Sequence, residues 1–293
     1  MTINEANKNR IEFHEIKNPT EDDKFIFIES MEFLIKNTND TKYMAELAGF
    51  YYAMQDFDLA IKYYEMSALQ DFPPAYMGLG YIWYYGRTGV KDYKKAFENY
   101  EKAMKHGDPI ATYKIADMYK NGYYVEKDYE KYKTIIIDLY LNHKNDISVF
   151  SIVPEIYTRM ANIYIEEGNN DKACKLLLEA KQVLAERISL NGFFGNFTIM
   201  EMLIKNLYKI QKIDSKNFDF YDLYYLLESP NTVLFDYEDE TYEVESCIED
   251  GFIVVRFNDV WFKTISDFMK KAEIGNTELS SIYYYLENFR IKE

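Results

Sequence analysis

The stretch "AYMGLGYIWYYGRTGVKDYKKAFENYEKAMKHGDPIATYKIADMYKNG", residues 75–122, contains a pattern that returns after 36 residues. At this offset Ala75 corresponds to Ala111, and Gly86 corresponds to Gly122. The other matched pairs are Gly80 with Ala116, Asp92 with Asp128, Tyr93 with Tyr129, Ala60 with Ala96, Tyr64 with Tyr100, and Asp56 with Asp92. Small, aromatic and turn-forming residues that recur together at one spacing indicate an internal structural repeat.

Each repeat has the pattern of two helices joined by a turn. Residues 92–107 carry apolar side chains at helical spacing and end in a glycine, which is a typical C-terminal stop. Gly86 lies in the preceding turn, where positive φ is needed. We expect Gly80 and Ala96 where the two helices approach each other, because a larger side chain would hold them apart.

Residues 75–111 resemble the Sel-one-like repeat, a relative of the tetratricopeptide repeat. The positions that match the family's pattern are Ala75, Leu79, Gly80, Gly86, Gly89, Val90, Asp92, Ala96, Tyr100, Lys102, Ala103, Gly107 and Ala111. Residues 111–132 are a weaker copy, with a lysine and a tyrosine where the family has a small residue. Residues 47–68 and 160–180 follow the shorter tetratricopeptide spacing.

The resemblance covers about half of the chain and implies a mainly α fold. The expected architecture is an α-solenoid of four stacked helix hairpins between residues 41 and 187. Residues 1–40 are expected to form a capping segment with a helix after Pro19. Thr20 and Asp23 have the spacing of a capping box at the start of that helix.

The pattern changes after the repeats. Residues 188–228 hold two more amphipathic stretches, 196–212 and 217–229, which we predict to be helices. Residues 229–293 are expected to form a small α+β segment. Apolar and polar residues alternate over 242–246, as in a half-buried strand.

The α+β segment is predicted to be an antiparallel meander of three or four strands covered by helices. The sequences "EDG" at 249–251 and "ND" at 258–259 are hairpin-turn signals. A small meander needs a helix over its apolar face. Residues 266–275 and 277–289 are the candidates for covering helices.

The chain is acidic, with a formal charge of −15. This charge disfavours direct binding to nucleic acid or to an anionic membrane and favours a basic partner. No Lys or Arg occurs between Lys216 and Arg256. The acidic residues there form an alternative docking surface, or else a solvated face: Asp236, Glu238, Asp239, Glu240, Glu243 and Glu245.

No motif for catalysis, metal binding or cofactor binding stands out. The three histidines, His14, His106 and His143, lack the spacing of a zinc site, and no phosphate-binding loop or nucleophile elbow is present. Cys174 and Cys247 do not make a disulfide framework. The sequence contains no signal-peptide core and no long apolar run, so we expect a cytoplasmic, bacterial protein with reduced thiols, without metal or cofactor.

The resemblance implies a non-catalytic scaffold that binds a protein or peptide. In tetratricopeptide-like repeats the first helix of each hairpin lines the concave surface, and tyrosines there give large contact area with few rotors. The candidate groove residues are Tyr52, Tyr81, Tyr84, Tyr85, Tyr113, Asp117, Lys120, Asn162 and Glu166. Packing between repeats is the alternative for the tyrosines, and simple exposure is the alternative for the charged residues.

Three other functions are considered at this point. An acidic immunity or antitoxin-type protein would neutralise a basic toxin in a salt-sensitive one-to-one complex. An enzyme is less favoured, because the Sel-one-like relatives discussed as hydrolases carry a cysteine pair in each repeat, which this chain lacks. A transcriptional regulator would need a DNA-binding module, and residues 1–17 are too short for one.

Overall fold

The computed structural model describes residues 1–146, 148–190, 194–210 and 218–292. The chain divides into two compact units, residues 1–135 and residues 136–293. The boundary falls within helix α8 (Tyr129–His143).

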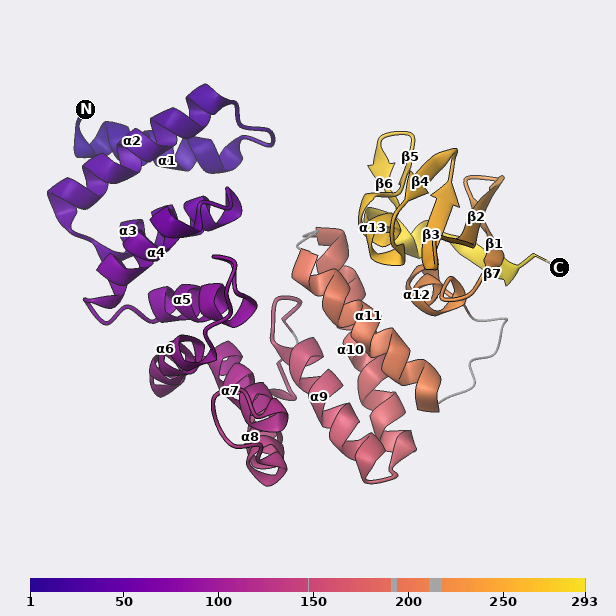
Figure 1. The fold of residues 1–293 in the computed structure, drawn as a ribbon. Coiled ribbons are helices and arrows are strands. Elements are labelled where there is room, and N and C mark those ends of the chain that lie inside the picture. Colours follow the sequence, from indigo (N-terminus) through magenta and orange to yellow (C-terminus); the bar gives the residue numbers. More distant parts are fainter. Residues whose placement is uncertain (147, 191–193, 211–217, 293) are drawn as a thin grey trace. The chain divides into compact units, whose positions relative to one another are not determined.

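The first unit is built from helix pairs (Figure 1). In chain order its complete helices are α1 (Ile3–Glu15), α2 (Glu21–Thr38), α3 (Thr41–Ala53), α4 (Phe57–Ala68), α5 (Pro73–Tyr85), α6 (Tyr93–Lys105) and α7 (Pro109–Asn121), followed by the start of α8. Helices pack within each pair, and successive pairs pack through α2–α3, α4–α5 and α6–α7. The predicted repeated hairpins and mainly helical fold are confirmed.

The 36-residue period is visible in the helix caps. The side chains of Asp56 and Asp92 accept hydrogen bonds from the backbone N–H three residues on and so cap α4 and α6. Asp128 does the same for Lys131 N at 2.9 Å. An aspartate at this position satisfies a backbone donor that the first helical turn leaves unpaired.

The N-terminal segment contains two helices where the sequence predicted one. The capping box of Thr20 and Asp23 at the start of α2 is confirmed. A second capping box, Thr2 with Glu5, starts α1, which we did not predict. Only one residue of α1, Ala6, is fully buried, so its apolar pattern is weak in the sequence.

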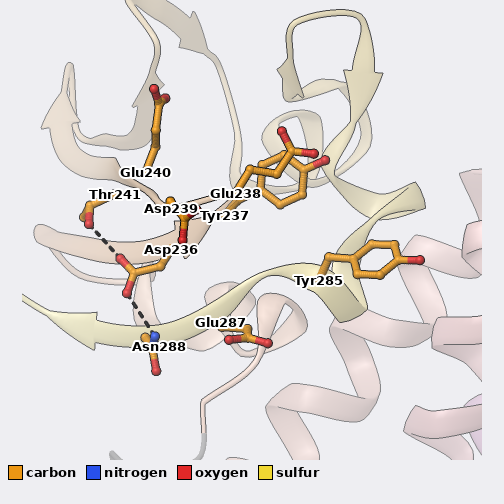
Figure 2. Close-up of a pocket in the computed structure, with 9 residues that line it drawn as sticks. All are labelled: Asp236, Tyr237, Glu238, Asp239, Glu240, Thr241, Tyr285, Glu287 and Asn288. Carbon is orange, nitrogen blue, oxygen red and sulfur yellow. Dashed lines mark hydrogen bonds between the residues drawn. The ribbon is translucent and has the colours of Figure 1, made fainter.

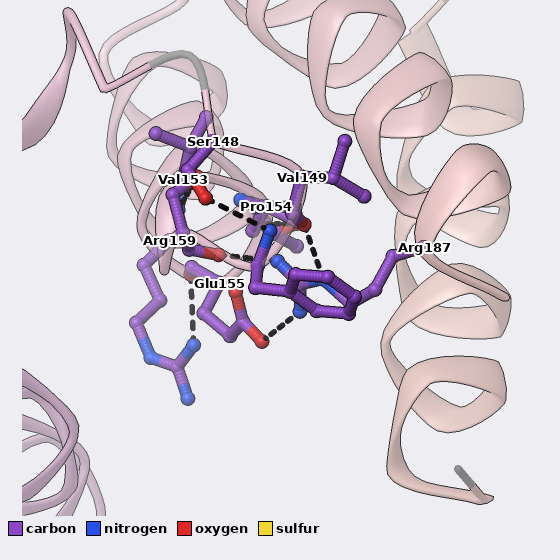
Figure 3. Close-up of polar contacts among 10 residues, drawn as sticks. Ser148, Val149, Val153, Pro154, Glu155, Arg159 and Arg187 are labelled. Carbon is purple, nitrogen blue, oxygen red and sulfur yellow. Dashed lines mark hydrogen bonds and ion pairs between the residues drawn. The ribbon is translucent and has the colours of Figure 1, made fainter. Parts of the chain in front are cut away.

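The second unit begins with three packed helices, α9 (Val153–Glu166), α10 (Asn170–Leu190) and α11 (Phe194–Ile210). The start of α9 is fixed by Arg187 of α10, as Figure 3 shows. Its guanidinium donates to Glu155 Oε1 at 2.8 Å, to Val149 O at 2.9 Å and to Ser151 O. These bonds satisfy carbonyl groups that would otherwise be buried without a partner.

The prediction of one helix over 217–229 is wrong in the length of the helix. The structure has a 3-10 turn, η1 (Phe220–Asp222), followed by the one-turn helix α12 (Leu223–Leu226). Asp219 and Asp222 form a capping box there, and both carboxylates pair with Lys181. Residue 217 lies outside the described residues, as do the last two residues of the predicted helix 196–212, most of which is α11.

The predicted meander is confirmed and is extended by one strand. In the described residues the sheet has the order β4-β3-β2-β1-β7, and all neighbours are antiparallel. The strands are β1 (Asn231–Tyr237), β2 (Glu240–Glu249), β3 (Phe252–Phe257), β4 (Val260–Phe262) and β7 (Glu287–Ile291). A two-residue turn joins each strand from β1 to β3 to the next strand in the chain. All six turn residues have positive φ: Glu238, Asp239, Asp250, Gly251, Asn258 and Asp259.

Of the two helices expected to cover the sheet, one is confirmed and the other is wrong. Helix α13 (Ile265–Lys271) places Phe268 against Phe257 and Phe262 of the buried sheet face. Residues 277–289 are not a helix. They form β6 (Thr277–Glu278), which pairs with β5 (Glu273–Ile274), then two 3-10 turns, η2 (Leu279–Ser281) and η3 (Tyr283–Tyr285), and the start of β7.

Candidate functional site

Helix α5 is held between its neighbours by two glycines. A Cβ added to Gly78 would lie 2.3 Å from the ring of Tyr64 on α4, and one added to Gly80 would lie 2.3 Å from the ring of Tyr100 on α6. The space at Gly80 is therefore filled by an aromatic ring. Helices α5 and α6 pack together, and the expected approach of Gly80 to Ala96 stays a prediction. The two rings fix the position of α5 and of the tyrosines it carries.

The turn after α5 places an arginine beside those tyrosines. Gly86 has a φ of 64° and ends the helix, and Arg87 N donates to Ile82 O at 3.0 Å. The same turn recurs 36 residues later, where Gly122 has a φ of 71° and Tyr123 N donates to Met118 O. Positive φ is the reason that glycine occupies both positions.

Arg87 connects tyrosines of two successive hairpins. Its Nε donates to Tyr52 Oη on α3 at 3.0 Å. Its guanidinium carbon lies 5.8 Å from the ring centre of Tyr52 and 5.3 Å from that of Tyr85 on α5. Both distances fall within the range of cation–π attraction.

Lys114 of α7 continues this array to the third hairpin. Its side-chain nitrogen lies 5.1–5.6 Å from the ring centres of Tyr81, Tyr84, Tyr85 and Tyr113. The same nitrogen donates to Tyr85 Oη at 2.8 Å. Lys114 is only 7% exposed, so its charge is surrounded by phenol rings. We call Tyr52, Tyr81, Tyr84, Tyr85 and Tyr113 the tyrosine face.

The phenols of Tyr84 and Tyr100 stay neutral. Burial raises the pKa of Tyr84, and the carboxylate of Asp117 adds to the shift. Burial also raises the pKa of Tyr100, far above its ordinary value. Neutral phenols donate and accept hydrogen bonds, and they present flat rings, which suits binding more than nucleophilic chemistry.

The predicted groove residues do not all lie in one place. The five tyrosines come together in the first unit, where Tyr85 is 41% exposed and Tyr113 is buried. Lys120 lies 4.9 Å from the ring of Tyr132. In the second unit, Asn162 accepts a hydrogen bond from Asn206, and Glu166 is exposed.

Sequence reasoning missed the two cations of the site, Arg87 and Lys114. A signal for Arg87 was present, because it directly follows the glycine that ends α5. Lys114 falls on the buried side of α7, where a charged residue contradicts the simple apolar pattern.

Four of the six residues of the predicted acidic surface line a cavity of about 580 Å³ in the second unit, shown in Figure 2, and Glu243 and Glu245 do not. Its lining residues are Asp236, Tyr237, Glu238, Asp239, Glu240, Thr241, Tyr285, Glu287 and Asn288. Three of the six predicted acids are paired with basic residues: Asp236 with Arg290, Glu243 with Lys292, and Glu245 with Arg256. Arg290 and other donors lower the pKa of Asp236.

Within the described residues, no group of three or more His, Cys, Asp and Glu side chains could hold a metal ion. His14 contacts Glu46 at 2.7 Å, and His106 contacts Asp71 at 3.0 Å. Among the helices of the described ranges, none has the length and apolar character to cross a membrane.

Comparison with known proteins identifies the repeats. The Sel1 repeat family model matches residues 43–72, 73–108 and 109–131. A Sel1 repeat protein from Oxalobacter formigenes, known from its crystal structure, aligns with a TM-score of 0.50 and 21% identity over 68% of this chain and 75% of that chain. No curated protein sequence matches the chain.

Two further solved structures are similar at lower scores. One is c5321, a protective antigen present in uropathogenic Escherichia coli strains that displays an SLR fold. It has a TM-score of 0.44 and 22% identity over 60% of this chain and 41% of that chain. The other is YrrB, a TPR protein with an unusual peptide-binding site, with a TM-score of 0.39 and 14% identity over 62% of this chain and 92% of that chain.

Repeats of this class are generally protein–protein interaction scaffolds and are typically non-catalytic. The family model, the 36-residue period and the stacked hairpins agree with one another. Residues 43–131 of the chain are similar to the Sel1 repeat family, and the stacked hairpins have the fold of Sel1-like repeat proteins.

Proposed function

We propose that the chain is a non-catalytic scaffold that binds a peptide or protein segment on the tyrosine face. The observation that carries this proposal is the continuous array from Tyr52 through Arg87 and Tyr85 to Lys114. These residues come from three successive hairpins, so an extended partner segment would contact all three repeats at once. A bacterial, cytoplasmic setting stays a prediction from the sequence.

Tyrosine suits such a surface for a physical reason. A phenol ring offers a large contact area, loses little rotamer freedom when it binds, and keeps one polar group for a hydrogen bond. Tyr85 is the most accessible ring of the tyrosine face at 41% exposure, and Tyr52, Tyr81 and Tyr84 are half-buried. Partial burial holds the rings in place before a partner arrives, which lowers the entropic cost of binding.

The test is a selection of displayed random peptides on the immobilised full chain, followed by affinity measurement on Tyr85→Ala. We expect enriched peptides to lose about tenfold or more in affinity for this variant, as for a central aromatic contact. Tyr124→Ala is the matched control, because Tyr124 is 53% exposed in the same unit but lies outside the tyrosine face. Equal binding by the wild type and Tyr85→Ala would contradict the assignment of the binding site to the tyrosine face.

The cavity of Figure 2 supports a second candidate, an acidic inhibitor of a basic protein. Glu238, Asp239 and Glu287 line it together with two tyrosines, and no Lys or Arg is part of its lining. Changing these three acids to Gln or Asn would abolish a salt-sensitive one-to-one complex if this surface is the site. Glu243→Gln is the control, because Glu243 is paired with Lys292. A complex that survives the triple change excludes this candidate.

A further inference from the structure

The ring of Tyr100 packs against the tyrosine face, and its buried hydroxyl has no hydrogen-bond partner among the described residues. The side chain is fully buried, and its ring centre lies 6.2 Å from that of Tyr81 and 6.1 Å from that of Tyr84. Burial raises the pKa of the Tyr100 hydroxyl, and the neighbouring phenols add to the shift. A buried hydroxyl without a partner is unfavourable, and such groups are usually satisfied by protein, water or ligand.

Two cations at the tyrosine face have hydrogen-bonding capacity to spare. Lys114 carries three N–H donors, one of which is engaged by Tyr85. Arg87 donates its Nε–H to Tyr52, while its terminal nitrogens make no ion pair with a described carboxylate. Tyr85 lies between the two cations, 5.3 Å from the guanidinium and hydrogen-bonded to the lysine.

The repeats that carry the tyrosine face are less acidic than the rest of the chain. Residues 43–131, the three Sel1 repeats, hold 11 Lys and Arg against 13 Asp and Glu. Residues 136–293 hold 16 Lys and Arg against 27 Asp and Glu. At the tyrosine face itself, Asp117 acts electrostatically on Tyr84, and the cations Arg87 and Lys114 both lie against its rings. The charge of this surface therefore suits an anionic group, although the chain as a whole is acidic.

We propose that Lys114, Arg87 and Tyr85 receive the side-chain carboxylate of an aspartate or glutamate in the partner segment. This inference rests on the proposed function and names the chemistry that the tyrosine face selects. Lysine and arginine donate charge-assisted hydrogen bonds to a carboxylate in surroundings from which water is largely excluded. The neighbouring rings contact the apolar part of the same segment. The basic partner favoured by net charge would not bind here.

The experiment is a peptide display selection on the full chain with two libraries. In the libraries the peptides are internal to the fusion, so that no free C-terminus is offered. One library contains Asp and Glu, and the other replaces them with Asn and Gln. We expect the first library to yield binders with an acidic residue at a fixed position, and replacement of that residue by its amide to weaken binding about tenfold or more.

Variants of the chain then assign the effect to the cations. Lys114→Met and Arg87→Met are expected to lose the preference for the acidic peptide, and Lys114→Arg is expected to keep it in part. Lys102→Met is the matched control. Lys102 also lies against a tyrosine ring, 5.1 Å from the ring centre of Tyr76, but it belongs to α6 and lies outside the tyrosine face. Urea unfolding of each variant establishes that it is folded. If Lys114→Met does not fold, Arg87→Met alone provides the test.

Three outcomes overturn the inference. Binders that depend on Tyr85 but show no acidic preference remove the carboxylate subsite and leave the proposed function intact. If synthetic peptides bind only with a free C-terminal carboxylate, and not as C-terminal amides, the recognised group is the C-terminal carboxylate and not a side-chain carboxylate. A selection that yields no Tyr85-dependent binder removes the subsite and the proposed function together.

Discussion

Gly80 shows how one missing side chain determines the packing of a repeat. The ring of Tyr100 occupies the position of its absent Cβ, and that ring also packs against Tyr81 of the tyrosine face. The sequence alone predicts that a small residue is needed at this position, because it recurs in the repeat pattern. It does not predict which neighbour fills the space, because an aromatic ring and a backbone both require a glycine.

Substitution of Gly80 by alanine is expected to destabilise the chain by about 1–3 kcal/mol, the usual cost of overpacking a well-filled interior. Gly49→Ala is the matched control. Gly49 lies inside helix α3, and its added Cβ would only touch Tyr64 Oη at 3.7 Å. Alanine there is expected to stabilise by about 0.5–1 kcal/mol through helix propensity. Urea unfolding midpoints of the two variants should shift in opposite directions, and equal shifts contradict this account of packing.

Lys181 holds the turn that replaces the predicted helix over 217–229. Its side chain is 12% exposed and pairs with Asp222, which is 2% exposed, at 2.8 Å. Lys181→Met is expected to cost about 3 kcal/mol, because it leaves a buried carboxylate unpaired. Lys175→Met on the same helix is the control and should change stability by less than about 0.5 kcal/mol, because its pair with Glu179 is exposed.

The contribution of Lys181 to the free energy of unfolding depends on pH in a defined way. Burial alone would lower the pKa of Lys181, but the carboxylates of Asp219 and Asp222 outweigh burial and raise it above 10.5. The stabilisation is therefore present below pH 10.5 and is lost as the pH rises through the pKa of the folded state. The difference in unfolding free energy between wild type and Lys181→Met should shrink in that window. A difference that stays constant to high pH contradicts the ion pair as its source.

At the scale of single elements, local pattern predicts the repeats well and the C-terminal segment less well. The helices of the repeats satisfy their own hydrogen bonds and follow a recurring pattern, so the sequence is sufficient. Residues 277–289 have buried positions Leu279, Leu286 and Phe289, whose spacing also fits a helix. Pairing of β7 with the free edge of β1 decides the structure instead, and this partner is about 50 residues away in the chain.

The three hairpin turns lend themselves to a direct test. Asp259 has a φ of 61° and follows Asn258 with a φ of 46°, so the turn has the geometry that favours Asn-Gly. Asp259→Gly is expected to stabilise the chain by about 0.5–1 kcal/mol, and Asp259→Ala to destabilise it by about 1 kcal/mol. Thermal unfolding of both variants measures the difference. Similar midpoints would mean that the turn does not have this conformation in solution.

At the scale of the molecule, the candidate site arises from residues that the chain places far apart. The site combines Tyr52 with Arg87, which follows 35 residues later, and with Lys114, which follows after another 27 residues. These residues come together only because the hairpins stack. The sequence predicts which helices carry the tyrosines, because the repeat resemblance assigns the first helix of each hairpin. It does not predict the cations, whose role depends on the rings that surround them. The division of the chain at residues 40, 187 and 228 stays a prediction.

Hydrogen–deuterium exchange of the full chain, with and without a partner segment obtained by selection, tests the central claim most directly. If the tyrosine face is the binding surface, amides of α3, α5 and α7 and of the turn at Gly86 and Arg87 should exchange more slowly in the complex. Exchange in β1, β2 and β7 should then stay unchanged. Protection confined to those strands, with the three helices unaffected, contradicts the account and assigns binding to the acidic cavity.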